Sequence, residues 1–244
     1  MPDSVRDLPF VEGTLGGLAR KKHGEGKGAM KTIPQMVFRR MARNVRDYGL
    51  ATTLKKTLSY LLGPIFGRRV YRIYRIDLSA FEIEVPDDSR FIYRFIDKND
   101  TRTMRQIEDV AEWLEGCLAG KLANGSLCLV ASDESVLAGF NLVSFGHVYI
   151  PLLRRHRLFR DGEAWSEDIM VCKEYRRIGL ASILRNRIFS ELRRRGIKRF
   201  YGGTLISNTA ALSLTRKVGF REIADAGYLR LMAFSRVRFR RARG

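Results

Sequence analysis

Apolar and polar residues follow three different patterns along the chain. Residues 1–31 are rich in glycine and charge and have no sustained period, which predicts a disordered basic tail. From residue 33 to about 62, apolar side chains recur every three or four positions among arginines and lysines, which is typical of an amphipathic helix. Gly63 and Pro64 end that pattern, and VYRIYRIDL then alternates like a strand. We therefore expect residues 32–77 to form a basic helical extension and a strand.

From Arg90 onward, strand patterns and helical patterns follow one another closely. Strands are predicted over RFIYRFI, SLCLVAS, VLAGFNLVSF, EAWSEDIMVC, RFYGGTLI and residues 220–234. Helices are predicted from Asp100 or Thr101 to Leu118, over Gly179–Arg195 and over 209–218, while the basic residues 147–162 are predicted to form a long loop. This order of elements indicates an α/β (α+β) fold, a mixed sheet with helices packed on it, within a domain of residues 78–235.

The composition favours a packed protein without a membrane span. The chain has 244 residues, and 45% of them are hydrophobic, which is enough to bury a core. No apolar run reaches the roughly 18 residues that cross a bilayer, and the first residues lack the apolar stretch of a signal peptide, so we expect a cytoplasmic location. The three cysteines, Cys117, Cys128 and Cys172, fit neither a disulfide framework nor a zinc spacing, and no metal is expected.

The formal net charge of +19 is concentrated at the two ends of the chain. Residues 1–77 carry a net charge of +10, and residues 236–244, which we expect to form an Arg-rich tail, carry +5. Basic ends of this kind bind nucleic acid or anionic lipid, or act only as solvated tails. The sequence contains no aromatic-interleaved basic strand like those of an RNA-binding sheet, which disfavours nucleic acid as a partner.

The basic helix predicted at residues 33–62 leaves three roles open. It packs on the main domain, it pairs with a second subunit in a homodimer, or it lies on the anionic inner face of a membrane. Its apolar stripe suits each of these roles. The third role also needs the basic residues beside the stripe, which are Arg39, Arg40, Arg43, Arg46, Lys55 and Lys56.

The segment with the clearest chemistry is RRIGLA, residues 176–181, between a predicted strand and a predicted helix. The first amides of a helix lack intrahelical acceptors and carry partial positive charge, so they bind anions. Gly179 lets the backbone approach a phosphate closely, and Arg176 and Arg177 add positive charge beside it. Two other phosphate-loop patterns, GxxxxGK[ST] and GxGxxG, do not occur in the sequence. These residues therefore predict a phosphate or pyrophosphate site.

Two motifs in this region resemble those of the GNAT superfamily of acyl-CoA N-acyltransferases. The family's pyrophosphate motif, [RQ]xxGx[GA], is matched by Arg176, Gly179 and Ala181. A second family pattern, N..A..L..K.GF, is matched from Asn208 to Phe220. The resemblance covers about residues 90–235. It implies a mostly antiparallel central sheet flanked by helices, to which the basic helical extension is added at the N-terminus.

The resemblance implies direct transfer of an acetyl group from acetyl-CoA, or of another acyl group from its acyl-CoA, to a primary amine. In relatives, the strand before the pyrophosphate loop splays from its neighbour, and its free backbone groups bind the pantetheine arm. A non-catalytic CoA-binding module with the same fold, associated with membrane or nucleic acid, is the alternative. The cofactor-binding residues implied here are Met170, Val171, Cys172, Arg176, Arg177, Ile178, Gly179, Leu180, Ala181 and Asn208.

The motifs do not fix the acid and the base of the transfer. Many relatives place a tyrosine seven residues after the Asn of the second motif, where this chain has Thr215, and relatives that act on protein N-termini place a Glu where it has Gly203. Glu167 and Asp168, on the strand before the loop, are candidate bases. Because adjacent strand residues face opposite sides, we expect only one of them to reach the substrate. Tyr228 is a candidate acid.

The predicted basic loop at residues 147–162 is the one indication of the acceptor. His147 and His156 in this loop are candidate substrate-binding residues beside the acceptor site. The arginines of the loop favour an acidic or phosphorylated small-molecule amine, although the same charge also suits a solvated surface. These arginines are Arg154, Arg155, Arg157 and Arg160.

Overall fold

The computed structural model describes residues 66–80, 89–151, 153, 155–231 and 234–241, without the side chains of 66–68, 228–231, 234–238 and 241. Contacts divide the chain into two units, one of which includes Arg68–Leu229 and Arg236–Gly244. The other unit, which includes Glu12–Gly67, contains few described residues. The tail predicted at 1–31 and the helix predicted at 33–62 both lie outside the described residues.

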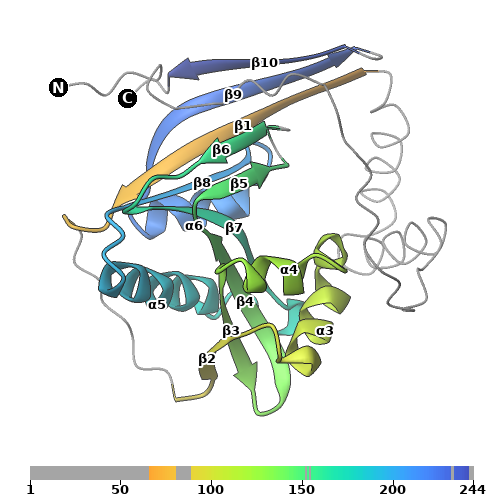
Figure 1. The fold of residues 1–244 in the computed structure, drawn as a ribbon, viewed down its shortest axis with the longest axis vertical. Helices are drawn as coiled ribbons and strands as arrows, with labels where there is room; N and C mark the ends of the chain where they lie inside the picture. Colours follow the sequence, from red (N-terminus) through yellow and green to blue (C-terminus); the bar gives the residue numbers. More distant parts are fainter. Residues whose placement is uncertain (1–65, 81–88, 152, 154, 232–233, 242–244) are drawn as a thin grey trace. The chain divides into compact units, whose positions relative to one another are not determined.

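Eight strands form one sheet in the order β10-β9-β1-β8-β7-β4-β3-β2 (Figure 1). The described pairings are antiparallel at β1–β8, β2–β3, β3–β4 and β4–β7, and parallel at β7–β8. The mostly antiparallel mixed sheet expected from the sequence is therefore confirmed. The strands are β1 Phe66–Asp77, β2 Ile92–Ile96, β3 Leu127–Asp133, β4 Val136–Ser144, β7 Glu163–Val171, β8 Arg199–Leu205, β9 Arg221–Leu231 and β10 Phe234–Arg241.

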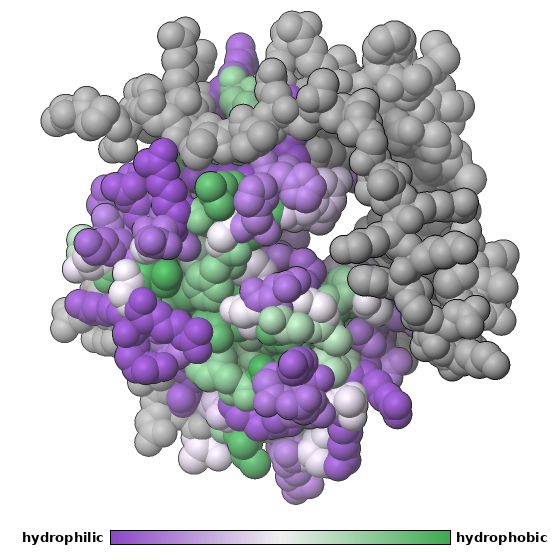
Figure 2. Space-filling view, viewed as in Figure 1, coloured by the Kyte–Doolittle hydropathy of each residue, from purple (hydrophilic) through white to green (hydrophobic). Residues whose placement is uncertain are grey.

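Helices cover both faces of the sheet (Figure 1). α5 (Leu180–Arg194) and α6 (Thr209–Lys217) pack on one face, and α3 (Thr101–Val110), η2 (Glu112–Leu114) and α4 (Leu118–Ala123) pack on the other. In β3, Leu127 and Leu129 are buried with α5, whereas Cys128 and Val130 are buried with α3 and α4. The sheet thus separates the core beneath α5 and α6 from the core beneath α3, η2 and α4. In the view of Figure 2, hydrophilic side chains gather over α5 and α3, and hydrophobic ones lie between them.

The helix predicted from residue 100 to 118 is broken into α3, η2 and α4. Asp100 caps α3 as predicted, because its side chain accepts a hydrogen bond from the Thr103 amide at 3.2 Å. Ala111 leaves the helical conformation at φ −128° and ψ 65°, and Gly116 adopts φ +73° before α4. The segment between these breaks brings Trp113 into contact with β7.

The basic segment at residues 147–162 is a hairpin of β5 (His147–Ile150) and β6 (Arg155–Leu158), not the predicted loop. Val148 and Ile150 are buried and alternate with exposed neighbours. The prediction was wrong because arginines dominate the composition of the segment and hide its period of two. The buried face of the hairpin packs on β1, β7 and β8 in a cluster that includes Tyr71, Ile73, Val148, Ile150, Leu153, Phe159, Trp165 and Tyr201.

Two expected boundaries lie elsewhere in the structure. β1 pairs with β8 from Tyr71 to Asp77, so the strand that we assigned to the extension at 32–77 is an interior strand of the sheet. β10 forms the sheet edge beside β9, where the sequence predicts an Arg-rich tail from residue 236. Arginines alternate with apolar residues in FSRVRFRR, and a period of two fits an edge strand. In the described part of the chain, no helix is both long and apolar enough to cross a lipid bilayer.

Candidate functional site

β7 and β8 separate after a short parallel pairing. Glu163, Ala164 and Trp165 pair with residues 199–201, and beyond this point no described residue of β8 pairs with β7. β7 nevertheless continues beside β4 to Val171, and β8 continues beside β1 to Leu205. The two strands therefore leave an opening in the sheet, which we call the wedge, bordered by residues 166–171 of β7 and 202–205 of β8.

The wedge side of β7 offers backbone groups to a ligand. Residues 167–171 are half-buried although β7 is an interior strand, and among the described residues they have no strand partner on this side. Arg176 reaches back from the following loop, and its Nε donates a hydrogen bond to the Val171 carbonyl at 3.1 Å. An extended ligand with amide groups would therefore find donors and acceptors along this edge.

The loop that joins β7 to α5 contains η3 (Lys173–Tyr175) and ends in a row of free amides. Gly179 is the N-cap of α5 with φ +89°, a left-handed conformation that favours glycine, and its helix has no side-chain cap. No described residue accepts a hydrogen bond from the amides of residues 177–181. Nothing lies within 4 Å of the position that a Cβ of Gly179 would occupy, so the space in front of the helix is open.

Positive charge accompanies these amides. Arg176 is half-buried through its bond to Val171, while Arg177 and Ile178 are exposed. Arg177 has a φ of +67°, a strained value for a residue other than glycine. The free amides, the dipole of α5 and two guanidinium groups together suit a pyrophosphate. Residues 176–181 of the predicted CoA site thus lie at the end of β7 where the wedge is open.

A bulge in β7 changes the expected orientation of the two candidate bases. The register of β7 with β4 shifts between Leu142 and Val143, which leaves Glu167 without an opposite residue. As a result, both Glu167 and Asp168 contact the η2–α4 side of the sheet. The expectation that these adjacent carboxylates face opposite sides is therefore wrong at this bulge.

Both carboxylate oxygens of Glu167 are engaged by neighbouring side chains. Lys121 of α4 places its Nζ 2.6 Å from Oε2, and the Ser144 hydroxyl donates to Oε1 at 2.6 Å. Ser126 extends this network, with its Oγ 2.7 Å from the Oγ of Ser144. The Glu167 side chain is only 9% exposed. These contacts hold the Glu167 side chain in place and favour a structural role for it.

Asp168 lies in a different electrostatic setting. The Trp113 Nε1 donates a hydrogen bond to its Oδ2 at 3.1 Å. Burial raises the pKa of Asp168 to about 6; the bond from Trp113 opposes this shift, and the charge of Glu167 adds to it. A carboxyl group with this pKa exchanges protons close to neutral pH, as a general base must. Asp168 therefore suits the role of base better than Glu167.

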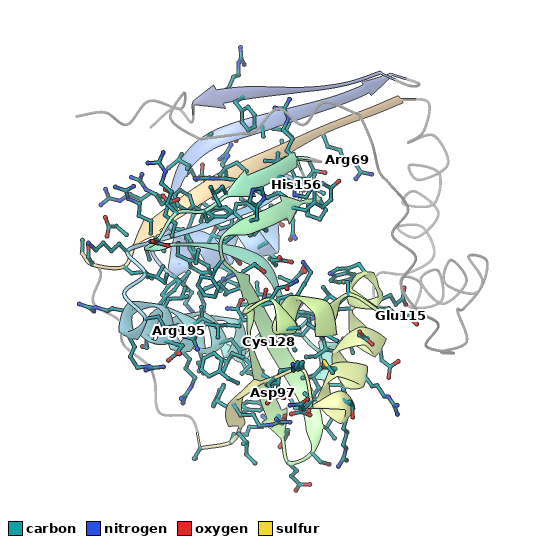
Figure 3. The ribbon with its side chains drawn as sticks, viewed as in Figure 1. Arg69, Asp97, Glu115, Cys128, His156 and Arg195 are labelled. Carbon is teal, nitrogen blue, oxygen red and sulfur yellow. The ribbon has the colours of Figure 1, made fainter. Side chains whose placement is uncertain are left out.

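The two candidate histidines lie on the exposed face of the hairpin (Figure 3 labels His156). His156 is directly opposite Tyr149, with ring centroids 4.9 Å apart, and the His147 ring lies 6.2 Å from that of His156. Arg157 points to the other face, is 3% exposed and stacks on Phe159 and Tyr201. The structure thus brings neither histidine into a described contact with the wedge, and it withdraws Arg157 from the basic surface.

The second motif shapes α6. Asn208 caps this helix, because its Oδ1 accepts a hydrogen bond from the Ala211 amide at 3.2 Å. Thr215 is 4% exposed, and its hydroxyl donates to the Leu212 carbonyl at 2.9 Å, so it has no proton free for a ligand. Tyr228 belongs to β9, but its side chain lies outside the described residues.

The cysteines have the properties of core thiols. Burial raises the pKa of Cys128 to about 12 and that of Cys172 to about 11, so neither forms a thiolate at neutral pH. Burial likewise raises the pKa of Cys117. Met170 and Cys172 pack against the core beneath α3 and α4. Among the described residues, no three or more side chains of His, Cys, Asp or Glu gather in a way that would hold a metal ion.

Two side chains beside the wedge are not among the residues that the sequence predicts for the site. Tyr74 of β1 lies across Gly202 of β8, and Arg185 of α5 is buried and donates a hydrogen bond to Ser166 of β7 at 2.9 Å. Tyr74 lies before the region that the two motifs cover, so the motifs say nothing about it. The signal that was present is the Gly202-Gly203 pair within a strand, because such glycines mark the close approach of another group.

A sequence model of the acetyltransferase (GNAT) family matches residues 71–220, which is more than half of the chain. The match begins within β1, earlier than residue 90, where the resemblance of the motifs begins, and it ends just after α6. No curated protein matches the chain in sequence.

Solved structures share the fold at low sequence identity. A functionally unknown protein of Staphylococcus epidermidis has a TM-score of 0.51 and 12% identity, over 70% of this chain and 65% of that one. A Drosophila protein has a TM-score of 0.50 and 16% identity over 76% of this chain, which spans only 58% of the Drosophila protein. The GCN5-related glucosamine N-acetyltransferase region of a fungal multi-domain β-N-acetylglucosaminidase has a TM-score of 0.50 and 13% identity, over 72% of this chain and 22% of that one.

Proposed function

The chain belongs to the GNAT acetyltransferase family, and we propose that it transfers an acetyl group from acetyl-CoA directly to a primary amine. The observation that carries this proposal is the wedge between β7 and β8, together with the free amides of residues 177–181 at its open end. CoA consists of a diphosphate group joined to a long amide-containing arm that ends in a thiol. The two features of the site correspond to these two parts.

We expect the diphosphate to accept hydrogen bonds from the amides at the start of α5, with Arg176 and Arg177 beside it. The pantetheine arm would then run along Met170, Val171 and Cys172, whose backbone groups border the wedge. Gly179 adopts a positive φ that favours glycine, so no side chain stands between the backbone and the diphosphate at this point. This arrangement leads the thioester toward the bulge of β7, where the candidate base lies.

Transfer from a thioester needs alignment, removal of one proton and stabilisation of an oxyanion. In the proposed reaction, the amine nitrogen attacks the thioester carbonyl carbon, and Asp168 accepts a proton from the nitrogen. A backbone N–H on the wedge side of β7 donates to the oxyanion. The carbon–sulfur bond then breaks, and the thiolate leaves. Cys172 has a pKa of about 11, which favours direct transfer over an acyl-cysteine intermediate.

The acceptor is proposed to bind beside η2 and α4, because Asp168 faces this side. Trp113 is 49% exposed and offers an apolar surface next to the base. An acidic or phosphorylated amine as the acceptor stays a prediction. One of the arginines that favoured it, Arg157, is buried against aromatic rings and is not available to a ligand. Amino sugars are a sensible class to test first, since one structure with the same fold is named a glucosamine N-acetyltransferase region.

Partners and location stay predictions. We propose that the helix predicted at residues 33–62 binds the anionic inner face of a membrane and that the rest of the protein lies in the cytoplasm. Packing of that helix on the domain, or a homodimer formed through it, are the competing outcomes. Pelleting with anionic but not neutral vesicles at low salt would support the membrane role, and equal binding to both would contradict it.

The function is tested by incubating the full chain with acetyl-CoA and a panel of amines, and by following thiol release. The panel should contain glucosamine, glucosamine 6-phosphate, an aminoglycoside and a polyamine. We expect thiol release that depends on one amine class, with an N-acetylated product of matching mass. A chain that binds CoA tightly yet releases no thiol above the rate of spontaneous hydrolysis with any amine would favour the alternative, a non-catalytic CoA-binding module.

A further inference from the structure

The ring of Tyr74 lies across β8 at the closed end of the wedge. Tyr74 pairs with Gly202, the first residue of β8 beyond the last β7–β8 pair. A Cβ on Gly202 would be 2.3 Å from Cε2 of Tyr74, 2.8 Å from Cζ and 3.0 Å from the hydroxyl oxygen. Only glycine at this position leaves room for the phenol. The pairing of β1 with β8 therefore carries a tyrosine hydroxyl to the point where the wedge opens.

Among the described residues, the hydroxyl of Tyr74 has no hydrogen-bond partner. Tyr74 is 5% exposed, and its ring packs edge-on against Phe220 with centroids 4.9 Å apart, which fixes its position. A tyrosine in a core normally has its hydroxyl paired, so a free hydroxyl here points to a ligand.

Arg185 supplies a positive charge on the same Phe220 ring that Tyr74 contacts. Its side chain is buried, its Nη1 donates to Ser166 at 2.9 Å, and its guanidinium lies over Phe200 and Phe220 at 5.5 and 5.7 Å. It makes no ion pair with a described carboxylate. Burial raises the pKa of Tyr74; the charge of Arg185 opposes that rise, and the charge of Asp168 adds to it. The phenol is therefore protonated at neutral pH, while the cation stabilises the phenolate that proton donation leaves.

Tyr74 approaches the same part of the fold from which the family's usual acid comes. The resemblance implies a tyrosine at residue 215, where this chain has a threonine whose proton is used within α6. Thr215 accepts a hydrogen bond from the Phe220 amide at 3.0 Å, and the Phe220 ring is the one that Tyr74 contacts. The phenol of Tyr74 thus enters beside α6 from β1, whereas the usual one enters from α6 itself.

From this geometry we propose that Tyr74 is the catalytic acid that protonates the sulfur of CoA when the acyl group leaves, an inference that rests on the acyl transfer proposed above. The amine nitrogen forms a bond to the carbonyl carbon, and the carbon–sulfur bond breaks with its electron pair on sulfur. The Tyr74 hydroxyl gives its proton to that sulfur and becomes a phenolate. The proton that Asp168 takes from the amine returns to the phenolate through solvent, so the enzyme is restored and the products are an amide and free CoA.

The test replaces Tyr74 by phenylalanine, which keeps the ring and removes only the hydroxyl. Tyr71→Phe is the matched control, because Tyr71 lies on the same strand, is 4% exposed and packs on the opposite face of the sheet under the hairpin. For each protein we measure the affinity for CoA by calorimetry and the thiolate absorbance of bound CoA against pH. We also measure the pH dependence of kcat with the best amine of the panel.

We expect Tyr74→Phe to bind CoA within about threefold of the unchanged chain, to raise the pKa of the bound thiol and to lower kcat by roughly 100-fold, as loss of general acid catalysis does. Tyr71→Phe should change none of these values. An unchanged thiol pKa together with an unchanged kcat in Tyr74→Phe would overturn the proposal. If the unchanged chain releases no thiol with any amine, the proposed transfer fails, and the thiol titration with CoA alone still decides whether Tyr74 contacts the sulfur.

Discussion

Two basic segments flank β7, the hairpin β5–β6 before it and the loop of residues 173–179 after it. In the hairpin, backbone groups are paired in a ladder, and Arg157 is buried with its guanidinium 4.4 Å from the centre of the Phe159 ring. In the loop, the amides from residue 177 onward bind no described acceptor, and Arg177 is exposed. Both segments carry a similar density of arginine, but the second also leaves successive backbone amides free at the start of a helix.

The difference shows that charge by itself does not mark an anion site. A guanidinium that stacks on aromatic rings contributes to packing and has little left to offer a ligand. The first amides of a helix have no hydrogen-bond acceptor within the helix, so they are available to a ligand.

The largest effect is expected at Gly179, where the contrast is most direct. Gly179→Glu places a negative charge and extra bulk in front of the free amides of α5. Loss of about two charge-assisted hydrogen bonds should weaken CoA binding roughly 1,000-fold by calorimetry. Gly196→Glu is the matched control, because Gly196 follows the other end of α5 with φ +76° and likewise has open space around it. Equal affinities for CoA in the two variants would remove the loop from the site.

The second prediction concerns Asp168, on the strand between the two segments. Asp168→Asn should lower kcat about 100-fold, because the variant cannot accept a proton. In the unchanged chain, activity should rise with pH through about 6, since the carboxylate must be ionised to act as the base. The pH profile of kcat/KM should lose this rise in Asp168→Asn and keep it in Glu167→Gln. A rise that survives in Asp168→Asn would assign the base elsewhere.

The raised pKa of Asp168 also has a consequence for stability. The folded state holds this proton more tightly than the unfolded state, whose carboxyl has a pKa near 3.9. The contribution of Asp168 to the free energy of unfolding is therefore fully present below pH 4 and is lost as pH rises through about 6. Urea denaturation at pH 4.5 and at pH 8 should show Asp168→Asn gaining stability relative to the unchanged chain at the higher pH.

The contrast between the segments also shows what the sequence could predict. Arg176, Gly179 and Ala181 are local in the chain, so their spacing sufficed to predict the helix start whose amides are free in the structure, while phosphate binding there stays a prediction. The bulge at Glu167 depends on the register with β4, and Tyr74 depends on the pairing of β1 with β8, so neither can be derived from a local pattern. The hairpin was missed because its period of two extends over only four residues in each strand.

The third prediction examines the hairpin arginine. Arg157→Ala should lower the free energy of unfolding by about 2 kcal/mol, because it removes a buried side chain stacked on Phe159 and Tyr201. Arg160→Ala, at an exposed position, should change it by less than about 0.5 kcal/mol. Both variants should bind CoA as the unchanged chain does. A large loss of CoA affinity in Arg157→Ala without a loss of stability would mean that the hairpin, too, serves an anion.

The smallest effect is expected at Asn208, which the resemblance assigns to the cofactor and the structure to the cap of α6. Asn208→Ala should cost about 1 kcal/mol of stability through loss of the cap and change CoA affinity less than about threefold.

Asn208→Asp separates the two roles, because aspartate caps as well as asparagine and is favoured by the dipole at a helix start. As a cap alone, the aspartate should restore stability and leave CoA affinity unchanged. If Asn208 touches a phosphate of CoA, the added negative charge should weaken binding at least tenfold while stability is restored, and the second motif would then join the loop before α5 as part of the anion site.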